Sequence, residues 1–189
     1  MGAMTSQEAK LAVLNEYLFK RGCLAGVTEG PWNSDVWVIT KNMYSIDIEI
    51  KVNREDLLNE LHTIAKTMRK DYQMRLRQRS AKLHKHQAYL DGNVIDRSEL
   101  LRRPNSFYLA FPHELLDHRI EMLSGTPYGV LLIEPDGRIE VYKKASKIHQ
   151  DKVTDEALIG LIRKTSTESY FLRAKLLERG VQYDVPKTE

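Results

Sequence analysis

Residues 44–52 are Tyr44-Ser45-Ile46-Asp47-Ile48-Glu49-Ile50-Lys51-Val52, an unbroken alternation of apolar and polar side chains after Tyr44. Successive side chains of a β-strand point to opposite faces, so a period of two predicts a strand. Isoleucines and Val52 form one face, and Asp47, Glu49 and Lys51 lie on the other. We therefore expect a strand with one buried apolar face and one face of charge.

The segments around this strand predict an α/β order. Residues 35–40 are rich in branched and aromatic side chains, which favours a preceding strand. Thr5-Ser6-Gln7-Glu8 has the spacing of a capping box and opens a helix that should end near Gly22. Its expected apolar face is Leu11, Leu14, Tyr17 and Leu18. Asn53 is a good N-cap for a long helix from about Arg54 towards Arg79.

The second half of the chain continues the alternation of strands and helices. Pro135-Asp136-Gly137 predicts a tight turn between a buried strand and its hairpin partner. The remaining expectations are a short strand at 24–28, a polar loop at 91–105, strands at 106–111, 128–134 and 138–142, a short helix at 114–123, and helix from 155 to about 180 in two pieces broken near 165–167. The fold class is α/β, with a central mixed sheet flanked by helices and additional C-terminal helices.

Length and composition place the chain among ordinary globular proteins. With 189 residues, 42% hydrophobic and 29% charged, it is the size of one domain. Residues 1–4 look like a vector-derived remnant ahead of a natural start, and neither a secretory signal nor a membrane-length apolar run follows. Cys23 is the single cysteine, which excludes an internal disulfide and favours a reducing, cytoplasmic setting.

Positive charge is concentrated in one segment. Residues 62–86 hold eight Lys or Arg against one Asp, a net +7 in a chain of net +3, which leaves −4 for the rest. Localised positive charge is typical of proteins that bind nucleic acid, although a solvated helix face is the usual alternative. The expected phosphate contacts are Arg75, Arg79, Lys82, Lys85 and His86.

Asp35 and the charged strand together suggest a metal site. Asp35 opens the strand expected to pair with residues 44–52, which would bring its carboxylate beside Glu49 and Lys51. Two carboxylates bind a hard divalent cation and leave positions for water and phosphate, while a lysine stabilises negative charge. A solvent-exposed ladder of opposite charges remains the alternative.

These residues resemble the PD-(D/E)XK nuclease superfamily over roughly residues 10–146. Glu49-Ile50-Lys51 follows Asp35 by one strand, and residues 49–56 are similar to the E-x-K-x-S-x-x-D stretch of a bacterial and phage branch. Asp35-Val36-Trp37, Lys85-His86 and the buried strand at 127–132 look like further parts of that branch. The three-residue signature alone is weak, since Glu8-Ala9-Lys10 in the first expected helix matches it too.

The resemblance implies a restriction-endonuclease-like core and a DNA endonuclease dependent on Mg²⁺ or Mn²⁺. Asp35, Glu49 and the carbonyl of Ile50 would bind the metal, and Lys51 would position water. Glu16 would complete the catalytic set from the first helix, unless it belongs to a solvated face. Asp47 is expected to be a supporting charge. Three departures from the family pattern are Ser34 in place of proline, Asn53 in place of serine, and a basic insertion at about 67–83.

Other possibilities stay open at this stage. A non-catalytic nucleic-acid-binding module could retain the same fold, and RNA ranks below DNA as the substrate because the sequence shows no RNA-binding aromatic motif. We expect residues 5–150 to form the nuclease-like domain and residues 151–189 a helical extension. That extension carries an apolar stripe at 170–177, which fits either packing on the domain or a homodimer contact.

Overall fold

The computed structural model describes residues 4–30, 33–68 and 104–178. Within these ranges one six-stranded mixed sheet forms the centre of the molecule, with its strands in chain order. They are β1 (Ala25–Thr28), β2 (Val36–Ile39), β3 (Ser45–Ile50), β4 (Ser106–Pro112), β5 (Gly129–Ile133) and β6 (Ile139–Lys143). β3, β4 and β5 are parallel, and the other neighbouring pairs are antiparallel. The expected α/β fold with a mixed sheet flanked by helices is confirmed.

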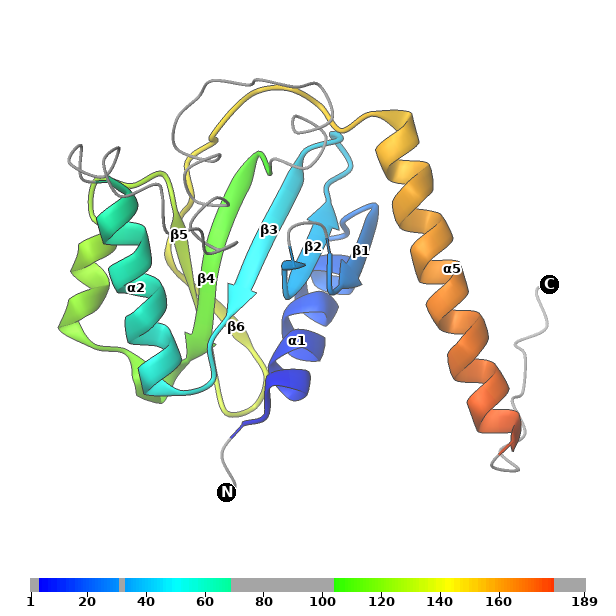
Figure 1. Cartoon of the computed structure of the whole chain (residues 1–189), viewed down its shortest axis with the longest axis horizontal. Helices are drawn as coiled ribbons and strands as arrows, with labels where there is room; N and C mark the ends of the chain where they lie inside the picture. The colour runs from blue at the N-terminus through cyan, green and yellow to red at the C-terminus, as the bar shows by residue number, and fades with distance from the viewer. Residues whose placement is uncertain (1–3, 31–32, 69–103, 179–189) are drawn as a thin grey trace, which may run out of the picture.

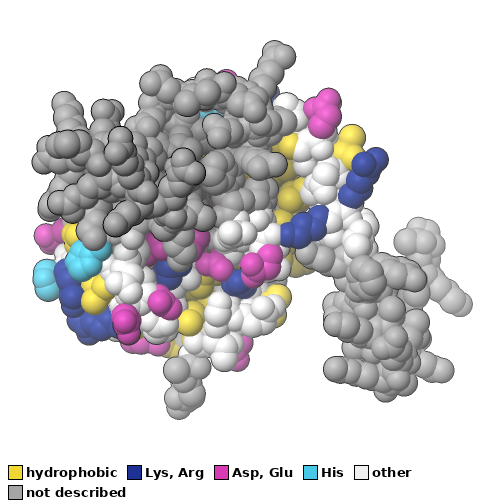
Figure 2. Space-filling view, viewed as in Figure 1, with side chains coloured by type: hydrophobic (Ala, Val, Ile, Leu, Met, Phe, Trp, Pro, Cys, Tyr) yellow, Lys and Arg dark blue, Asp and Glu magenta, His cyan; other side chains and the backbone are white. Residues whose placement is uncertain are grey.

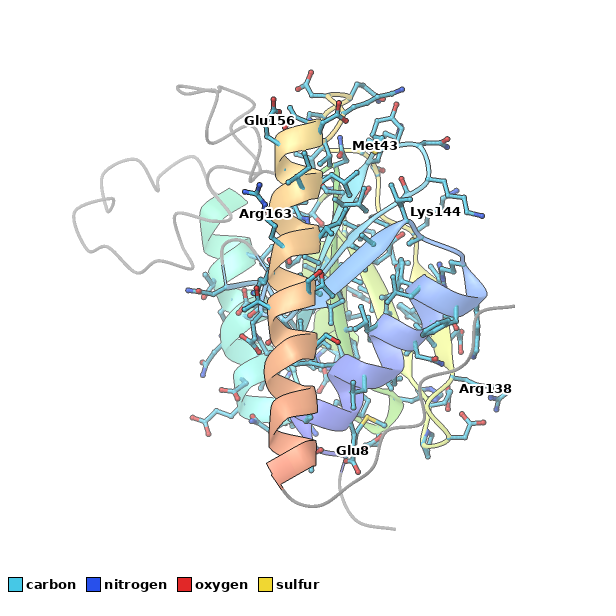
Figure 3. All side chains as sticks on the ribbon, turned by 90° about the vertical axis from the view of Figure 1, so that its right-hand side faces the viewer. Glu8, Met43, Arg138, Lys144, Glu156 and Arg163 are labelled. Carbon is cyan, nitrogen blue, oxygen red and sulfur yellow. The ribbon has the colours of Figure 1, made fainter. Side chains whose placement is uncertain are left out.

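Helices lie on both faces of this sheet. α1 (Ser6–Asn15) continues into a π-helical turn, η1 (Glu16–Lys20), on one face, and α2 (Arg54–Met68) lies on the other (Figures 1 and 3). Each helix buries an apolar stripe against its own face of the sheet. β3 sends Ile48 and Ile50 to the α1 side, so the predicted alternation of its side chains is confirmed.

The first helix begins where the capping box predicts. The Thr5 backbone N–H donates to Glu8 Oε2 at 2.8 Å, and the Glu8 N–H donates back to Thr5 Oγ1 at 3.3 Å. Its buried residues are Ala9 and Val13, whereas Leu11, expected on the apolar face, is 54% exposed. The helical segment ends before Gly22, whose φ of +63° suits glycine.

Residues 113–123 form two short 3-10 turns in place of the expected single helix. They are η4 (His113–Leu115) and η5 (His118–Leu123), and Asp117 caps the second by accepting from the Arg119 N–H. The hairpin at Pro135-Asp136-Gly137 is present, with Gly137 at φ +80° between β5 and β6. Local turn chemistry thus predicted the hairpin but not the extended break at Leu116–Asp117.

The last helix, α5 (Asp155–Glu178), is continuous, so the break expected near 165–167 is wrong. Its first half packs on the β1 edge, where Leu158 and the buried Leu161 meet Val27, Trp37 and Ile39. Thr165 and Thr167 fit within the helix because their hydroxyls donate to backbone carbonyls one turn earlier. In Figure 1 the helix runs on past the end of β1.

None of the helices in the described ranges has the length and apolar character needed to cross a membrane. The long helix expected from Arg54 is confirmed as far as Met68. The predicted phosphate contacts at Arg75, Arg79, Lys82, Lys85 and His86 lie outside the described residues.

Candidate active site

The charged face of β3 is buried. Asp47, Glu49 and Lys51 are 0%, 6% and 7% exposed, and Glu60 of α2, which faces them, is 4% exposed. Removing charges from water is expensive unless they are paired, so such a group is unusual on the core side of a sheet. Strongly buried ionisable groups gathered in one place are typical of functional sites. On the surface of the molecule, on the side where α2 covers the sheet, acidic and basic side chains also lie next to one another (Figure 2).

Lys51 lies between two carboxylates. Its ammonium is 2.5 Å from Glu49 Oε1 and 3.6 Å from Glu60 Oε2. Glu49 belongs to the same strand, whereas Glu60 is brought in by α2, whose neighbouring Leu57, Leu61 and Ile64 pack in the core. Lys51 is therefore shared between a carboxylate of the strand and a carboxylate of the helix.

Asp35 lies at the edge of the same site and fixes the start of β2. Register pairs Val36 with Ile48, and one further step in the same register sets Asp35 opposite Glu49. Residues directly opposite in an antiparallel pair have Cα atoms about 4.5–5.5 Å apart. Asp35 Oδ2 accepts from the Ile50 backbone N–H at 2.7 Å. We call Asp35, Glu49, Lys51 and Glu60 the β3 charge cluster.

Lys10 of α1 joins this cluster from the other face of the sheet. Its ammonium lies 2.9 Å from Asp35 Oδ1 and also pairs with Glu29. Partial burial opposes the charge, yet hydrogen bonds to Glu29 and Asp35 raise the pKa of Lys10 above its usual value. Lys10 is therefore a firmly charged partner for the Asp35 carboxylate.

The proposed metal ligands are oxygen atoms, which suit a hard divalent ion, but they include only two carboxylates. Mg²⁺ prefers carboxylate and carbonyl oxygens and commonly keeps several waters. Asp35, just before β2, and Glu49 and the Ile50 carbonyl of the neighbouring β3 would supply such oxygens. In the described part of the chain no three His, Cys, Asp or Glu side chains gather as a metal-binding group. A metal here would take two carboxylates, a carbonyl and water.

Glu16 is held away from the β3 charge cluster by its own partners. Its carboxylate lies 3.3 Å from Lys20 Nζ and 3.0 Å from Arg21 Nε, all within or just after η1. The α1 side chain in contact with Asp35 is Lys10, six residues earlier and about 9 Å along a helix from Glu16. The proposed catalytic role of Glu16 stays a prediction that these contacts do not favour.

Sequence reasoning missed Lys10 and Glu60. Both had a detectable signal, because Glu60 is three residues after Leu57 and four before Ile64, which places a carboxylate on the apolar stripe of its helix. Lys10 stands three residues before the buried Val13 in the same way. A charged residue on the core face of a helix predicts a buried partner, here Lys51 and Asp35.

Comparison with known proteins gives a fold and no activity. No protein-family model and no curated protein matches the chain. A solved structure, the SPO1766 protein of unknown function from Silicibacter pomeroyi, is similar with a TM-score of 0.52 and 15% identity, over 97% of this chain and 99% of that one. At this identity the likeness shows the fold alone.

Proposed function

We propose that this protein is a metal-dependent deoxyribonuclease of the PD-(D/E)XK kind, which hydrolyses DNA phosphodiester bonds as an endonuclease with Mg²⁺ or Mn²⁺. The observation that carries the proposal is the β3 charge cluster, in which Glu49 and Lys51 are buried together beside Asp35. Burying acids and a cation together costs solvation free energy, and such an arrangement favours a catalytic role over a structural one.

The strand order also supports the proposal. A helix, three antiparallel strands, a helix and a strand parallel to the third strand follow one another from α1 to β4. This order is similar to that of the PD-(D/E)XK core, and the proposed metal ligands Asp35 and Glu49 lie just before β2 and near the end of β3.

Each residue of the cluster has a role in this proposal. Asp35, Glu49 and the Ile50 carbonyl would hold the metal, which when bound polarises the phosphoryl oxygen and acidifies a bound water. Lys51 would hold the attacking water or stabilise charge developing on the phosphate. Glu60 would keep the Lys51 ammonium in place, because it contacts that group from α2.

We take the proposed substrate and setting from the resemblance and from the distribution of charge along the sequence. The basic segment 62–86 would contact DNA phosphates without reading sequence, in repair, restriction or mobile-element processing. The single cysteine suits a reducing, cytoplasmic location. A homodimer formed through the C-terminal helix would give two active sites for the two strands of a duplex.

A second candidate is a non-catalytic nucleic-acid-binding module. The Asp35 carboxylate favours this candidate, because one of its oxygens is paired with Lys10 and the other accepts from the Ile50 N–H. With Lys51 against Glu49, the cluster is internally paired without a metal. The two candidates differ in whether a divalent ion binds and DNA is cut.

The test is cleavage of supercoiled, linear, single-stranded and branched DNA with Mg²⁺ or Mn²⁺, using Glu49→Gln and Lys51→Met. Glu140→Gln is the matched control, because Glu140 is exposed on β6, away from the cluster. The nuclease requires metal-dependent cutting that both site variants lose and the control keeps. Binding of DNA without cutting, equal in all variants, would establish the non-catalytic module.

A further inference from the structure

A pocket lies on the α1 side of the sheet. It has a volume of about 300 Å³ and is bordered by η1, the β2–β3 turn and β4. We call it the tyrosine pocket and define it by Tyr17, Arg21, Thr40, Lys41, Asn42 and Tyr108. Thr40 follows β2 whereas Asp35 precedes it, and Tyr108 faces the α1 side, so this pocket and the β3 charge cluster occupy opposite ends and opposite faces of the sheet.

The charges at this pocket are positive. Arg21 and Lys41 line it, and among the described residues that line it there is no Asp or Glu. The two lining cations carry +2, and Glu16, which pairs with Arg21 and with Lys20, lies outside the lining residues. Lys41 forms no ion pair within the described residues. A small anion would be attracted here without competing with a carboxylate in the wall.

Lys41 lies close to the backbone at Gly22, and Arg21 contacts the side chains of Glu16 and Tyr17. A Cβ on Gly22 would lie 3.3 Å from Lys41 Nζ, so the absence of a side chain lets the ammonium pack closely against the backbone. Gly22 has a φ of +63°, which also suits glycine. Arg21 is ion-paired to Glu16 at 3.0 Å and lies 4.8 Å from the centre of the Tyr17 ring. These interactions orient two cations at one pocket.

The Tyr17 hydroxyl is an unusual group in the wall of this pocket. It is buried, lines the pocket through its residue, and has no hydrogen-bond partner among the described residues. Burial and the neighbouring Tyr108 raise the pKa of Tyr17, so its O–H remains a donor across the physiological range. Buried polar groups are nearly always satisfied, so a buried hydroxyl without a partner is unusual in a residue that lines a pocket. Tyr17 also belongs to a π-helical turn, a feature common at functional sites.

We propose that the tyrosine pocket binds a small phosphorylated metabolite of mononucleotide size. A phosphomonoester carries close to two negative charges, which matches the net +2, and Arg and Lys are the usual phosphate-binding side chains. Thr40 and Asn42 add polar groups at the rim, and Tyr108 and Ile46 provide an apolar wall for the ring. The volume is at the small end of ligand pockets. This site is independent of the proposed nuclease activity.

The test is calorimetric titration of the full chain with adenosine 5′-monophosphate, inorganic phosphate and adenosine, in the presence of EDTA. We expect saturable one-to-one binding of the monophosphate and weaker binding of phosphate or adenosine alone. Lys41→Met should lower the affinity for the monophosphate roughly 10- to 100-fold, which is the usual effect of removing a charged hydrogen bond. Lys20→Met is the matched control, because Lys20 is near the pocket but does not line it.

Tyr17→Phe separates a binding role from a structural one. Removing a buried hydroxyl without a partner should leave the free energy of unfolding unchanged or raise it. The same change should lower the affinity for the monophosphate if the O–H donates to it. No saturable binding, equal weakening in Lys20→Met, or adenosine binding as tightly as its monophosphate would overturn the proposal. Glu49→Gln should bind the monophosphate like the unaltered protein, so failure of the nuclease and failure of this site are distinguishable.

Discussion

The Asp35 carboxylate accepts a hydrogen bond of 2.7 Å from the backbone N–H of Ile50, which joins the residue before β2 to the last residue of β3. Its other oxygen lies 2.9 Å from the ammonium of Lys10 on α1. One side chain therefore connects three elements of the fold. Because Asp35 is also a proposed metal ligand, its structural and chemical roles have to be separated by experiment.

Replacing Asp35 by Asn and by Ala should separate these roles. Asn keeps an oxygen that can accept from Ile50, whereas Ala leaves that N–H without its acceptor, at about 1–3 kcal/mol of unfolding free energy. Urea unfolding should therefore rank Asp35→Ala as clearly less stable than Asp35→Asn. Both variants should lose at least about tenfold in Mn²⁺ affinity, since even residues that only orient ligands change affinity 10- to 100-fold. Metal affinity that is unchanged in both would remove Asp35 from the site.

Lys51 and Glu60 should be energetically coupled. Lys51→Met leaves Glu49 and Glu60 as buried acids without their shared cation, and breaking such a pair destabilises by about 3–5 kcal/mol. Glu60→Gln in the same chain relieves part of that destabilisation, so the double variant should be more stable than the sum of the single changes predicts. A double-mutant cycle by urea unfolding measures this. Purely additive effects would mean that the 3.6 Å ion pair carries no coupling.

Asp117 should make folding sensitive to acid. The Arg119 side chain and its backbone N–H hold the pKa of Asp117 well below its usual range. A carboxylate with a lowered folded-state pKa stabilises the fold above its unfolded value of about 3.9, and this contribution disappears as pH falls through the folded value. The difference in stability between the unaltered protein and Asp117→Asn should thus be constant near neutral pH and shrink below about pH 4. Denaturant unfolding across this range checks it, and a difference that grows in acid would contradict the linkage.

Leu161 should anchor α5 to the sheet. It is 6% exposed against Val27, Trp37 and Ile39, whereas its neighbour Ile162 is 50% exposed. Leu161→Ser should release the helix and speed proteolysis within it, because truncating a buried leucine typically costs about 2–5 kcal/mol. Ile162→Ser makes the same chemical change on the solvent side and should leave the cleavage rate nearly unchanged. Equal protease sensitivity would show that α5 is held by other residues.

The basic segment should determine the salt dependence of DNA binding. Alanine at Arg75, Arg79 and Lys82 removes three side chains expected to neutralise DNA phosphates. The slope of log affinity against log salt should then flatten by about 0.9 for each phosphate that is no longer neutralised on duplex DNA. Fluorescence anisotropy at several salt concentrations measures the slope. Alanine at Arg138, exposed at the β5–β6 turn, is the control and should leave the slope unchanged.

Local features of this fold were predictable because they depend on neighbours in the chain. The Thr5–Glu8 capping box, the alternation along β3 and the Gly137 turn each need only a few consecutive residues. The same holds for the apolar stripe that begins α2. Backbone geometry and the periodicity of side chains fix such features before any long-range packing forms.

The sequence-based expectations were wrong where the structure depends on packing between residues that are far apart in the chain. Leu11 is exposed because the α1 stripe that meets the sheet runs through Ala9 and Val13, and α5 stays continuous across a serine- and threonine-rich stretch. The partners of Asp35 and Lys51 differ most from expectation. Lys10 and Glu60 enter the site from two different helices on opposite faces of the sheet.

By itself the sequence determined the α/β class, the charged strand and the pairing of that strand with the one that follows Asp35, since all three follow from periodicity and one strand register. Only the tertiary structure decided that this charge is buried, that Lys51 lies between two carboxylates and that a cationic pocket forms around Tyr17. Burial and long-range ion pairs depend on how helices dock on a sheet. That docking sums many weak interactions over the whole chain and leaves no short pattern in the sequence.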